Sequence, residues 1–201
     1  GTYVTGLAAK NAATELREKI CAKAAQMWGV DATDVVFDGQ YVRLSDERAA
    51  REQNRYLTLR DFANLCVKNI AGGDALTSHA SACLPVSPPP FMAGIAEVEV
   101  DKATGKVTVV DYAAAVDCGT VINEALARVQ AEGGIAQGIG HALYEIVEHD
   151  ERGRLRTGNF MSYKLPTRLD IGSIRVAFEP SYEPTGPFGA KSIGEVVINT
   201  P

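Results

Sequence analysis

The chain has 201 residues, of which 46% are hydrophobic and 22% are charged, a composition typical of one globular domain or two small packed ones. Its net charge is −5, with 20 basic and 25 acidic residues well mixed along the sequence. No basic stripe is available for binding the phosphates of nucleic acid, and no apolar run reaches the roughly 18 residues of a membrane-spanning helix. We therefore expect a cytoplasmic protein that binds neither nucleic acid nor membrane and carries no signal peptide.

The four cysteines lie far apart and form no CxxC pair; they are Cys21, Cys66, Cys83 and Cys118. Zinc and iron–sulfur sites take their cysteines from closely spaced pairs, and disulfide frameworks belong to shorter secreted chains. We therefore predict no metal ligands in this chain, and reduced, mostly buried thiols.

The first part of the chain predicts helices around a small hairpin. A long helix is expected from a cap at Thr5 to a stop at Gly29. Residues 34–42 predict two short strands around an Asp-Gly turn, and the charged residues 45–55 are expected at the surface. A second helix is expected from Thr58 to about Asn69, ended by the glycine-rich residues 71–74.

The second part predicts a sheet covered by one helix. The prolines of residues 85–90 indicate an extended connector. Residues 91–100 alternate in polarity, which predicts a half-buried strand, and residues 107–116 are apolar nearly throughout, which predicts a central one. The turn between them is short enough for an antiparallel hairpin. A helix from Asn123 to about Glu145 should pack on this sheet, and Ile174–Phe178 should add a short strand.

Four glycines lie within residues 133–140 of this third helix. Each costs about 1 kcal/mol relative to alanine in a helix interior, so a close approach of a neighbouring backbone or a ligand is expected to offset the cost. A dinucleotide-binding loop is not supported, because the GxGxxG pattern is incomplete and the cluster lies inside a helix. Tight helix packing is the simpler interpretation.

Glu195 lies in the glycine- and proline-rich segment 184–195, just before an apolar tail. A carboxylate beside small residues suits a general base, but a solvated surface glutamate has the same pattern. Gln130 on the third helix has no special signature, and the histidines His79, His141 and His149 form no ligand cluster. Residue patterns alone thus give an α+β protein without a reaction.

Three stretches, in order, resemble the molybdenum hydroxylases, which include xanthine dehydrogenase, aldehyde oxidase and carbon monoxide dehydrogenase. The first runs from Ala96-Glu97-Val98-Glu99-Val100-Asp101 to Asp117-Cys118-Gly119 and Asn123, the second is residues 130–140, and the third is Gly189-Ala190-Lys191-Ser192-Ile193-Gly194-Glu195. Each stretch is weak alone, but the ordered set is specific and covers essentially the whole chain. Val196-Val197 departs from the Pro-Pro pair that often follows the glutamate in this family.

The resemblance implies that residues 1–201 are the C-terminal portion of a molybdopterin-binding domain in the catalytic subunit, with a possible sub-boundary near 71–90. The implied fold is α+β, with an antiparallel or mixed sheet packed with a few long helices. Both ends of the chain look cut, so we expect it to be inactive alone and to bind pterin poorly, since cofactor-binding energy comes from several converging segments.

The resemblance also implies roles for individual residues. Glu195 matches the catalytic carboxylate, which accepts a proton from the water-derived oxygen that attacks the substrate. Gln130 matches a side-chain amide that contacts the cofactor, and an amide offers both a donor and an acceptor. Gly1 and Thr2 fall at the edge of another cofactor-contacting segment, and Gly133 and Gly134 are expected to let cofactor or the Glu195 loop come close. No residue is expected to bind metal directly. In the isolated chain we expect the loop to be loosely held.

The implied cofactor of the full enzyme is molybdopterin, in its cytosine dinucleotide form, with a 2Fe-2S cluster and FAD in other domains or subunits; none is expected in this chain alone. Its partners would be the remainder of the molybdopterin domain, the iron–sulfur and FAD units, and a small heterocyclic substrate. The implied reaction is hydroxylation of a purine or another N-heterocycle. Alternatives are aldehyde oxidation, a non-catalytic subunit that completes a molybdopterin site, and an unrelated α+β binding module.

Overall fold

The computed structural model describes residues 1–68, 76–83 and 86–201. The chain forms two compact units, one of residues 5–83 and one of residues 1–4 with 84–201. The expected helix stop at 71–74 and the first proline of the expected connector, Pro85, lie outside the described residues. The possible sub-boundary near 71–90 stays a prediction. No helix among the described residues is both long and apolar enough to cross a membrane.

Helix α1 (Thr2–Trp28) begins earlier than predicted. Thr5 does not cap it, because the helix already includes Thr2, and the Tyr3 side chain is buried and shares a 2.5 Å hydrogen bond with Thr185 Oγ1. Packing of this first turn therefore overrides the local capping signal. The predicted stop is confirmed: Gly29 follows the helix with φ of 67°, a left-handed conformation suited to glycine.

The unit of residues 5–83 contains a three-stranded antiparallel sheet, β1 (Val35–Phe37), β2 (Tyr41–Leu44) and β3 (Tyr56–Thr58), with a short 3₁₀ turn, η1 (Ala32–Asp34), before it. The Asp-Gly hairpin turn was predicted. The short helix α2 (Glu47–Glu52) was not predicted, because only one residue of the charged region 45–55, Ala50, is buried. The strand β3 was not predicted either.

Helix α3 (Leu59–Val67) is capped as predicted, by the Thr58 hydroxyl, which accepts a 3.1 Å hydrogen bond from Asp61 N. The core of this unit joins α1, the sheet and α3. Its buried members are Ile20, Ala24, Ala25, Val35, Val42, Phe62 and Cys66.

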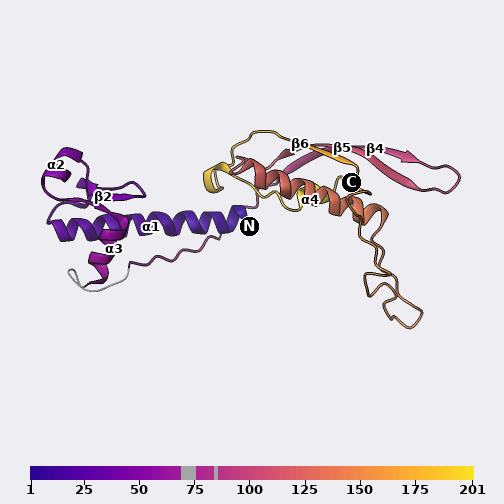
Figure 1. Ribbon diagram of the computed structural model, residues 1–201, viewed down its shortest axis with the longest axis horizontal. Coiled ribbons are helices and arrows are strands. Elements are labelled where there is room, and N and C mark those ends of the chain that lie inside the picture. The colour runs from indigo at the N-terminus through magenta and orange to yellow at the C-terminus, as the bar shows by residue number, and fades with distance from the viewer. Residues whose placement is uncertain (69–75, 84–85) are drawn as a thin grey trace. The chain divides into compact units, whose positions relative to one another are not determined.

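The other unit is a three-stranded sheet with strand order β4-β5-β6, packed against one long helix (Figure 1). Strands β4 (Phe91–Val100) and β5 (Val107–Asp117) pair antiparallel, as predicted, and β5 is central. Strand β6 (Ser173–Phe178) runs parallel to β5, which a crossover through a helix permits. The predicted α+β class with a mixed sheet is therefore confirmed.

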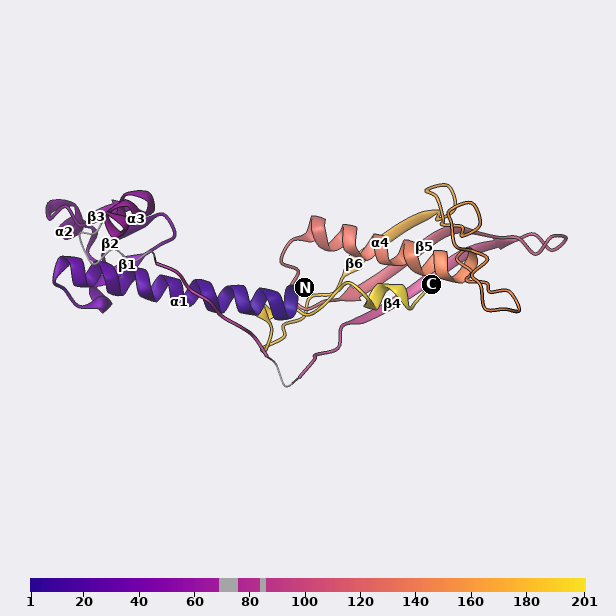
Figure 2. The same ribbon diagram turned by 90° about the horizontal axis from the view of Figure 1, so that it is seen from below.

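Helix α4 (Glu124–Leu143) covers one face of this sheet, and Figure 2 shows from below that it runs along the strands. Asn123 caps it as predicted, with Oδ1 accepting a 3.0 Å hydrogen bond from Leu126 N. The shared core takes residues from β5, β6, α4 and the C-terminal segment: Val109, Tyr112, Ala114, Val116, Cys118, Ala131, Ile135, Ile139, Val176 and Val197.

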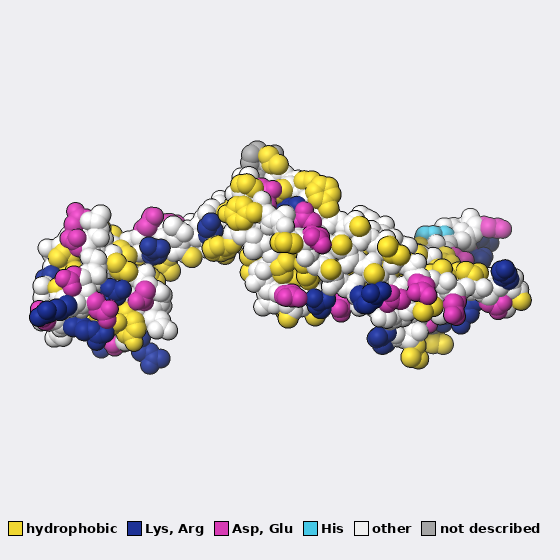
Figure 3. All heavy atoms as spheres, turned by 90° about the horizontal axis from the view of Figure 1, so that it is seen from above, with side chains coloured by type: hydrophobic (Ala, Val, Ile, Leu, Met, Phe, Trp, Pro, Cys, Tyr) yellow, Lys and Arg dark blue, Asp and Glu magenta, His cyan; other side chains and the backbone are white. Residues whose placement is uncertain are grey.

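Strand β4 is an exposed edge strand, so the prediction that it is half-buried is wrong. Ile95 is 76% exposed, and Val98 and Val100 are also exposed. The hairpin formed by β4 and β5 extends past the end of α4 (Figure 1), so no helix covers its far end. Figure 3 shows this part of the molecule from above, with hydrophobic side chains scattered among acidic and basic ones.

The crossover from α4 to β6 contains a long irregular loop, which includes a turn at Asp150–Gly153. At its base the Tyr163 hydroxyl donates a 2.5 Å hydrogen bond to Glu145 Oε2. After β6 the chain continues through two 3₁₀ turns, η2 (Pro187–Gly189) and η3 (Val196–Ile198).

The glycines of α4 serve different purposes. A Cβ added at Gly134 would lie 2.2 Å from Val197 Cγ2, and one at Gly138 would lie 2.6 Å from the Ile198 carbonyl oxygen. These two glycines therefore let the C-terminal segment pack directly on the helix, as expected for a close backbone approach. Gly133 is different, because a Cβ there would meet nothing within 4 Å.

Gly134 and Gly133 provide a matched test of this packing. Gly134→Ala should lower the free energy of unfolding by about 1–3 kcal/mol, because the buried Val197 must shift. Gly133→Ala should instead raise it by about 1 kcal/mol, the gain in helix propensity at an open position. Urea unfolding of the two variants would measure both effects, and equal shifts in the same direction would contradict the assignment.

Candidate functional site

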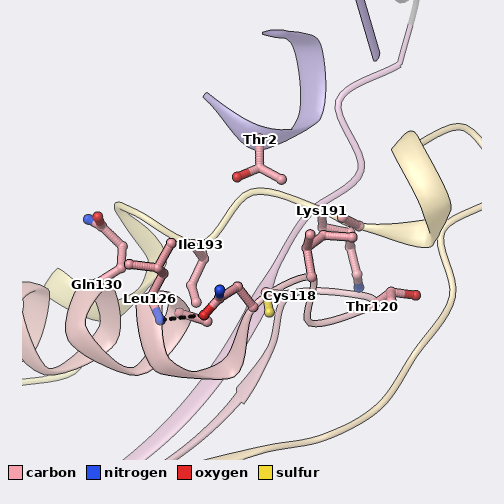
Figure 4. A pocket seen from close by; sticks show the side chains of 11 residues that line it. Thr2, Cys118, Thr120, Leu126, Gln130, Lys191 and Ile193 are labelled. Carbon is pink, nitrogen blue, oxygen red and sulfur yellow. Dashed lines mark hydrogen bonds between the residues drawn. The ribbon is translucent and has the colours of Figure 1, made fainter. Parts of the chain in front are cut away.

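A cavity of about 270 Å³ lies where α4 begins. Its walls come from the start of α1, the chain just after β5, the first turns of α4 and the C-terminal segment (Figure 4). The lining residues are Thr2, Cys118, Thr120, Ile122, Asn123, Leu126, Ala127, Gln130, Ala190, Lys191 and Ile193.

The turn after β5 shapes one wall. Gly119 has φ of 71° and lies so close to the C-terminal segment that an added Cβ would be 2.3 Å from the Gly189 carbonyl oxygen. Thr120 N donates to that oxygen at 2.8 Å, and Lys191 N donates to the Cys118 carbonyl oxygen at 2.7 Å. Two segments far apart in the sequence are thus joined as a short antiparallel bridge.

Lys191 and Asp117 form an ion pair at this bridge, with 2.6 Å between Lys191 Nζ and Asp117 Oδ2. Asp117 Oδ1 also accepts a 2.5 Å hydrogen bond from Ser181 Oγ and a 2.9 Å one from Gly119 N. Burial by itself raises the pKa of Asp117, but these hydrogen bonds and the Lys191 charge outweigh it and hold the pKa below its ordinary value. Asp117 is therefore ionised near neutral pH.

Cys118 contributes a buried thiol to the cavity wall. Burial, together with the nearby Asp117 carboxylate, raises the pKa of this thiol. It stays protonated near neutral pH, so its role here is packing and not nucleophilic chemistry.

Two of the residues singled out from the sequence line the cavity. Thr2 reaches it from the first turn of α1, and Gln130 stands on α4 at one end (Figure 4). The Gln130 side-chain nitrogen is also close to Gly194, where an added Cβ would lie 3.6 Å away. Gly1 is exposed, is not among the lining residues and has open space around it.

Gly133 is exposed one turn after Gln130 on α4. Gly134 is buried beneath Val197, a side chain of this same chain, and its contact with cofactor stays a prediction. It serves the other role considered for the glycines, admitting the segment that carries Glu195.

Glu195 lies between the cavity and this packed tail. Its side chain is exposed and is not among the lining residues, although Ile193, two residues earlier, is. Its backbone carbonyl accepts a 3.3 Å hydrogen bond from Ile198 N in η3. The structure thus brings the Glu195 segment, but not the carboxylate itself, to the cavity that Gln130 lines.

The loop that precedes Glu195 packs against the rest of its unit at several residues. Pro187, Gly189, Ala190 and Lys191 are buried, and the bridge to Gly119 anchors them. Lys191 and Asp117 both lie in the family-like stretches of the sequence, but no role was predicted for either residue. The one sequence feature that could have indicated the ion pair is that an aspartate and a lysine lie in two separate stretches of the same family pattern.

The donor set of the cavity suits part of a pterin cofactor. Among the described lining residues the polar side chains are amides, hydroxyls, a thiol and the paired Lys191, and none is a carboxylate that would repel phosphate. The cavity volume of about 270 Å³ lies just below the roughly 300–1,000 Å³ of pockets that enclose a whole small ligand. The described residues contain no group of three or more histidine, cysteine or acidic side chains placed to hold a metal ion.

Asp117→Asn tests the electrostatics of the bridge. The folded carboxyl has a pKa below its ordinary value of 3.8, so the unfolded chain binds more protons in acid. The stabilisation from the pair is complete above that ordinary value and is lost as pH falls through the depressed one. At neutral pH the substitution should cost about 1–3 kcal/mol of unfolding free energy.

Urea unfolding between pH 3 and 7 measures this, and the difference between variant and wild type should shrink as the pH falls. Asp111→Asn is a matched control, because Asp111 also pairs with a basic side chain, that of Arg175. The Arg175 side chain is 68% exposed, whereas that of Lys191 is 9% exposed. Solvent screening makes the loss smaller there. A cost for Asp117→Asn that is independent of pH would contradict the ion-pair account.

Comparison with known proteins places this chain in a family. Residues 1–172 match the molybdopterin cofactor-binding domain. The chain is 34% identical over 200 residues to the "Probable hypoxanthine oxidase XdhD" of Escherichia coli (strain K12), covering 99% of this chain and 20% of that protein. It is 32% identical to the xanthine dehydrogenase molybdenum-binding subunit of Escherichia coli O157:H7, covering 98% and 26%.

A solved structure gives the same result. Quinoline 2-oxidoreductase from Pseudomonas putida 86 matches with a TM-score of 0.70 and 30% identity, over 94% of this chain and 24% of that one. The chain therefore spans about a fifth to a quarter of the length of these relatives. The resemblance to molybdenum hydroxylases is confirmed at the level of the family: this chain belongs to the molybdopterin cofactor-binding domain family.

Proposed function

We propose that the full protein is a molybdenum-dependent hydroxylase that oxidises a purine or another N-heterocycle, using oxygen derived from water. The observation that carries the proposal is the cavity beside Gln130, bordered by the segment that ends in Glu195. Two relatives are a probable hypoxanthine oxidase and a xanthine dehydrogenase subunit, and a structural neighbour is a quinoline oxidoreductase. Xanthine and hypoxanthine are purines and quinoline is another N-heterocycle, so these relatives favour a purine as substrate first and another N-heterocycle second.

The reaction replaces a C–H bond by C–OH and releases two electrons and two protons, with water as the oxygen source. The bound molybdenum cofactor, in its cytosine dinucleotide form, supplies this two-electron chemistry. A 2Fe-2S cluster and FAD in other domains or subunits take the electrons onward. The remainder of the molybdopterin domain is then a necessary partner, and the enzyme works in the cytoplasm.

The residues of this chain would bind, orient and move one proton. The Gln130 amide can donate and accept at a polar edge of the cofactor, and the Thr2 hydroxyl reaches the same cavity. Gly133, exposed and without a neighbour within 4 Å of an added Cβ, leaves room for close approach beside Gln130. Gly1, next to Thr2, would contact the cofactor through its backbone.

Glu195 would serve as the general base. A carboxylate can accept the proton from the water-derived oxygen as it attacks the electron-poor carbon. Its exposure here also fits the second candidate, a non-catalytic subunit that completes a molybdopterin site. The two candidates differ in whether the enzyme needs the carboxylate.

Glu195→Gln in the full enzyme should lower kcat by at least about 10²–10⁴, the usual contribution of a general base, and by more because the proton transfer creates the nucleophile. The amide is nearly isosteric, so molybdenum and pterin content should stay normal. Gln130→Ala should instead lower pterin content, with a smaller fall in activity per bound molybdenum. Near-normal kcat of Glu195→Gln at full molybdenum content would support the non-catalytic candidate.

The substrate class is tested by comparing kcat/KM of the full enzyme on hypoxanthine, xanthine, quinoline and an aromatic aldehyde, with an artificial dye as electron acceptor. Oxygen-18 water should label the product. We expect the highest kcat/KM for a purine. Preference for the aldehyde, with none of the heterocycles oxidised, would refute the proposed class.

A further inference from the structure

Lys191 is the only buried charged side chain among the residues that the structure describes. Its ammonium contacts three groups: the Asp117 carboxylate at 2.6 Å, the Pro89 carbonyl oxygen at 3.4 Å and the face of the Phe91 ring, with 5.2 Å to the centroid. Burying an ammonium is costly unless it is paired and hydrogen-bonded. These contacts provide that compensation.

The arrangement of Asp117 favours a fixed geometry. Its two oxygens are divided between partners, since Oδ2 accepts from Lys191 while Oδ1 accepts from Ser181 Oγ and Gly119 N. The carboxylate cannot rotate without losing several hydrogen bonds at once. Lys191 is thus attached to a rigid point at the end of the central strand β5.

The backbone at Lys191 is held at the same place. Lys191 N donates to the Cys118 carbonyl oxygen at 2.7 Å, and Ala190 pairs with Gly119. The side-chain pair and the backbone bridge therefore act on the same residue. Four positions later the chain reaches Glu195.

A second anchor lies on the other side of Glu195. Val197 is fully buried against Gly134 of α4. The intervening residues 192–196 are partly or fully exposed and contain one glycine, Gly194. Because the segment is short, the positions of its two ends restrict where Glu195 can be.

We propose that Lys191, through its ion pair with Asp117, is a positioning residue for Glu195. The inference rests on the proposed function, because it concerns how the general base of that reaction is held. Lys191 does not act on the substrate itself, since its ammonium is already occupied by Asp117 and the Pro89 carbonyl. It fixes the N-terminal end of the segment whose C-terminal end is fixed by Val197.

Lys191→Met in the full enzyme tests the proposal, because methionine keeps much of the apolar stem and removes the ammonium. We expect kcat per bound molybdenum to fall by about 10- to 100-fold, since a misplacement near 1 Å can cost about 10². KM should change little, and molybdenum and pterin content should stay normal. Arg175→Met is the control, because it removes the exposed pair with Asp111 on the same strand and should leave kcat unchanged.

Two further variants separate positioning from general damage. Ser181→Ala removes one hydrogen bond to Asp117 and should fold, with a partial fall in kcat in the same direction. In a Glu195→Gln background, Lys191→Met should cause no further loss, because the group that it positions is already absent.

Hydrogen exchange of the full protein gives a readout that does not depend on turnover. The amides of Lys191 and Thr120, which close the bridge, should exchange faster in Lys191→Met, while the amides of α4 should be unaffected. This comparison can be made even for a variant with no measurable activity.

The possible failures are distinguishable. If Glu195→Gln is inactive but Lys191→Met keeps kcat per molybdenum within twofold of wild type, the positioning role is wrong. A Lys191→Met enzyme that loses molybdenum while the remaining loaded enzyme turns over normally would show a purely structural role and would also overturn it. If Glu195→Gln stays active, the proposed function is wrong. Unchanged hydrogen exchange at the amides of Lys191 and Thr120 in Lys191→Met would refute the positioning role independently of activity.

Discussion

The packing of Val197 onto Gly134 is the constraint from which the candidate site follows. A helix with glycine at this position loses about 1 kcal/mol of propensity, yet an added Cβ would fall 2.2 Å from the valine side chain. Burial of Val197, which belongs to the same core as residues of β5 and β6, offsets that loss of helix propensity. It also brings the C-terminal segment alongside Gln130, so that α4 and this segment line the cavity together.

The ion pair of Lys191 and Asp117 complements this apolar contact. Apolar packing fixes how close two elements lie but tolerates rotation and small shifts, whereas a paired charge with divided hydrogen bonds is directional. One end of the Glu195 segment is held by each kind of interaction. A general base needs both: proximity to the reacting atoms and an orientation that survives thermal motion.

The sequence predicted the elements with strong local signals and missed those decided by tertiary contacts. The caps at Thr58 and Asn123 and the stop at Gly29 were predictable because capping is local chemistry. The exposure of β4 was not, since alternation reports which residues share a face but not whether another element covers it. For the site, family motifs identified Gln130 and Glu195 as candidates. The ion pair was not predicted, because it joins residues 117 and 191, and no periodicity in the sequence reveals a contact at that separation.

Gly133 and Gly134 show why neighbouring residues of one motif can have opposite purposes. Successive helix positions point about 100° apart, so Gly134 faces the tail while Gly133 faces outward. The cost of Gly134 is offset within this chain, but that of Gly133 has no offset among its described neighbours. Under the proposed function, a close contact from cofactor or from the remainder of the molybdopterin domain would be the physical reason to keep a glycine there. The exposed Glu195 fits the same account, because as the proposed general base it would serve groups supplied by other parts of the enzyme.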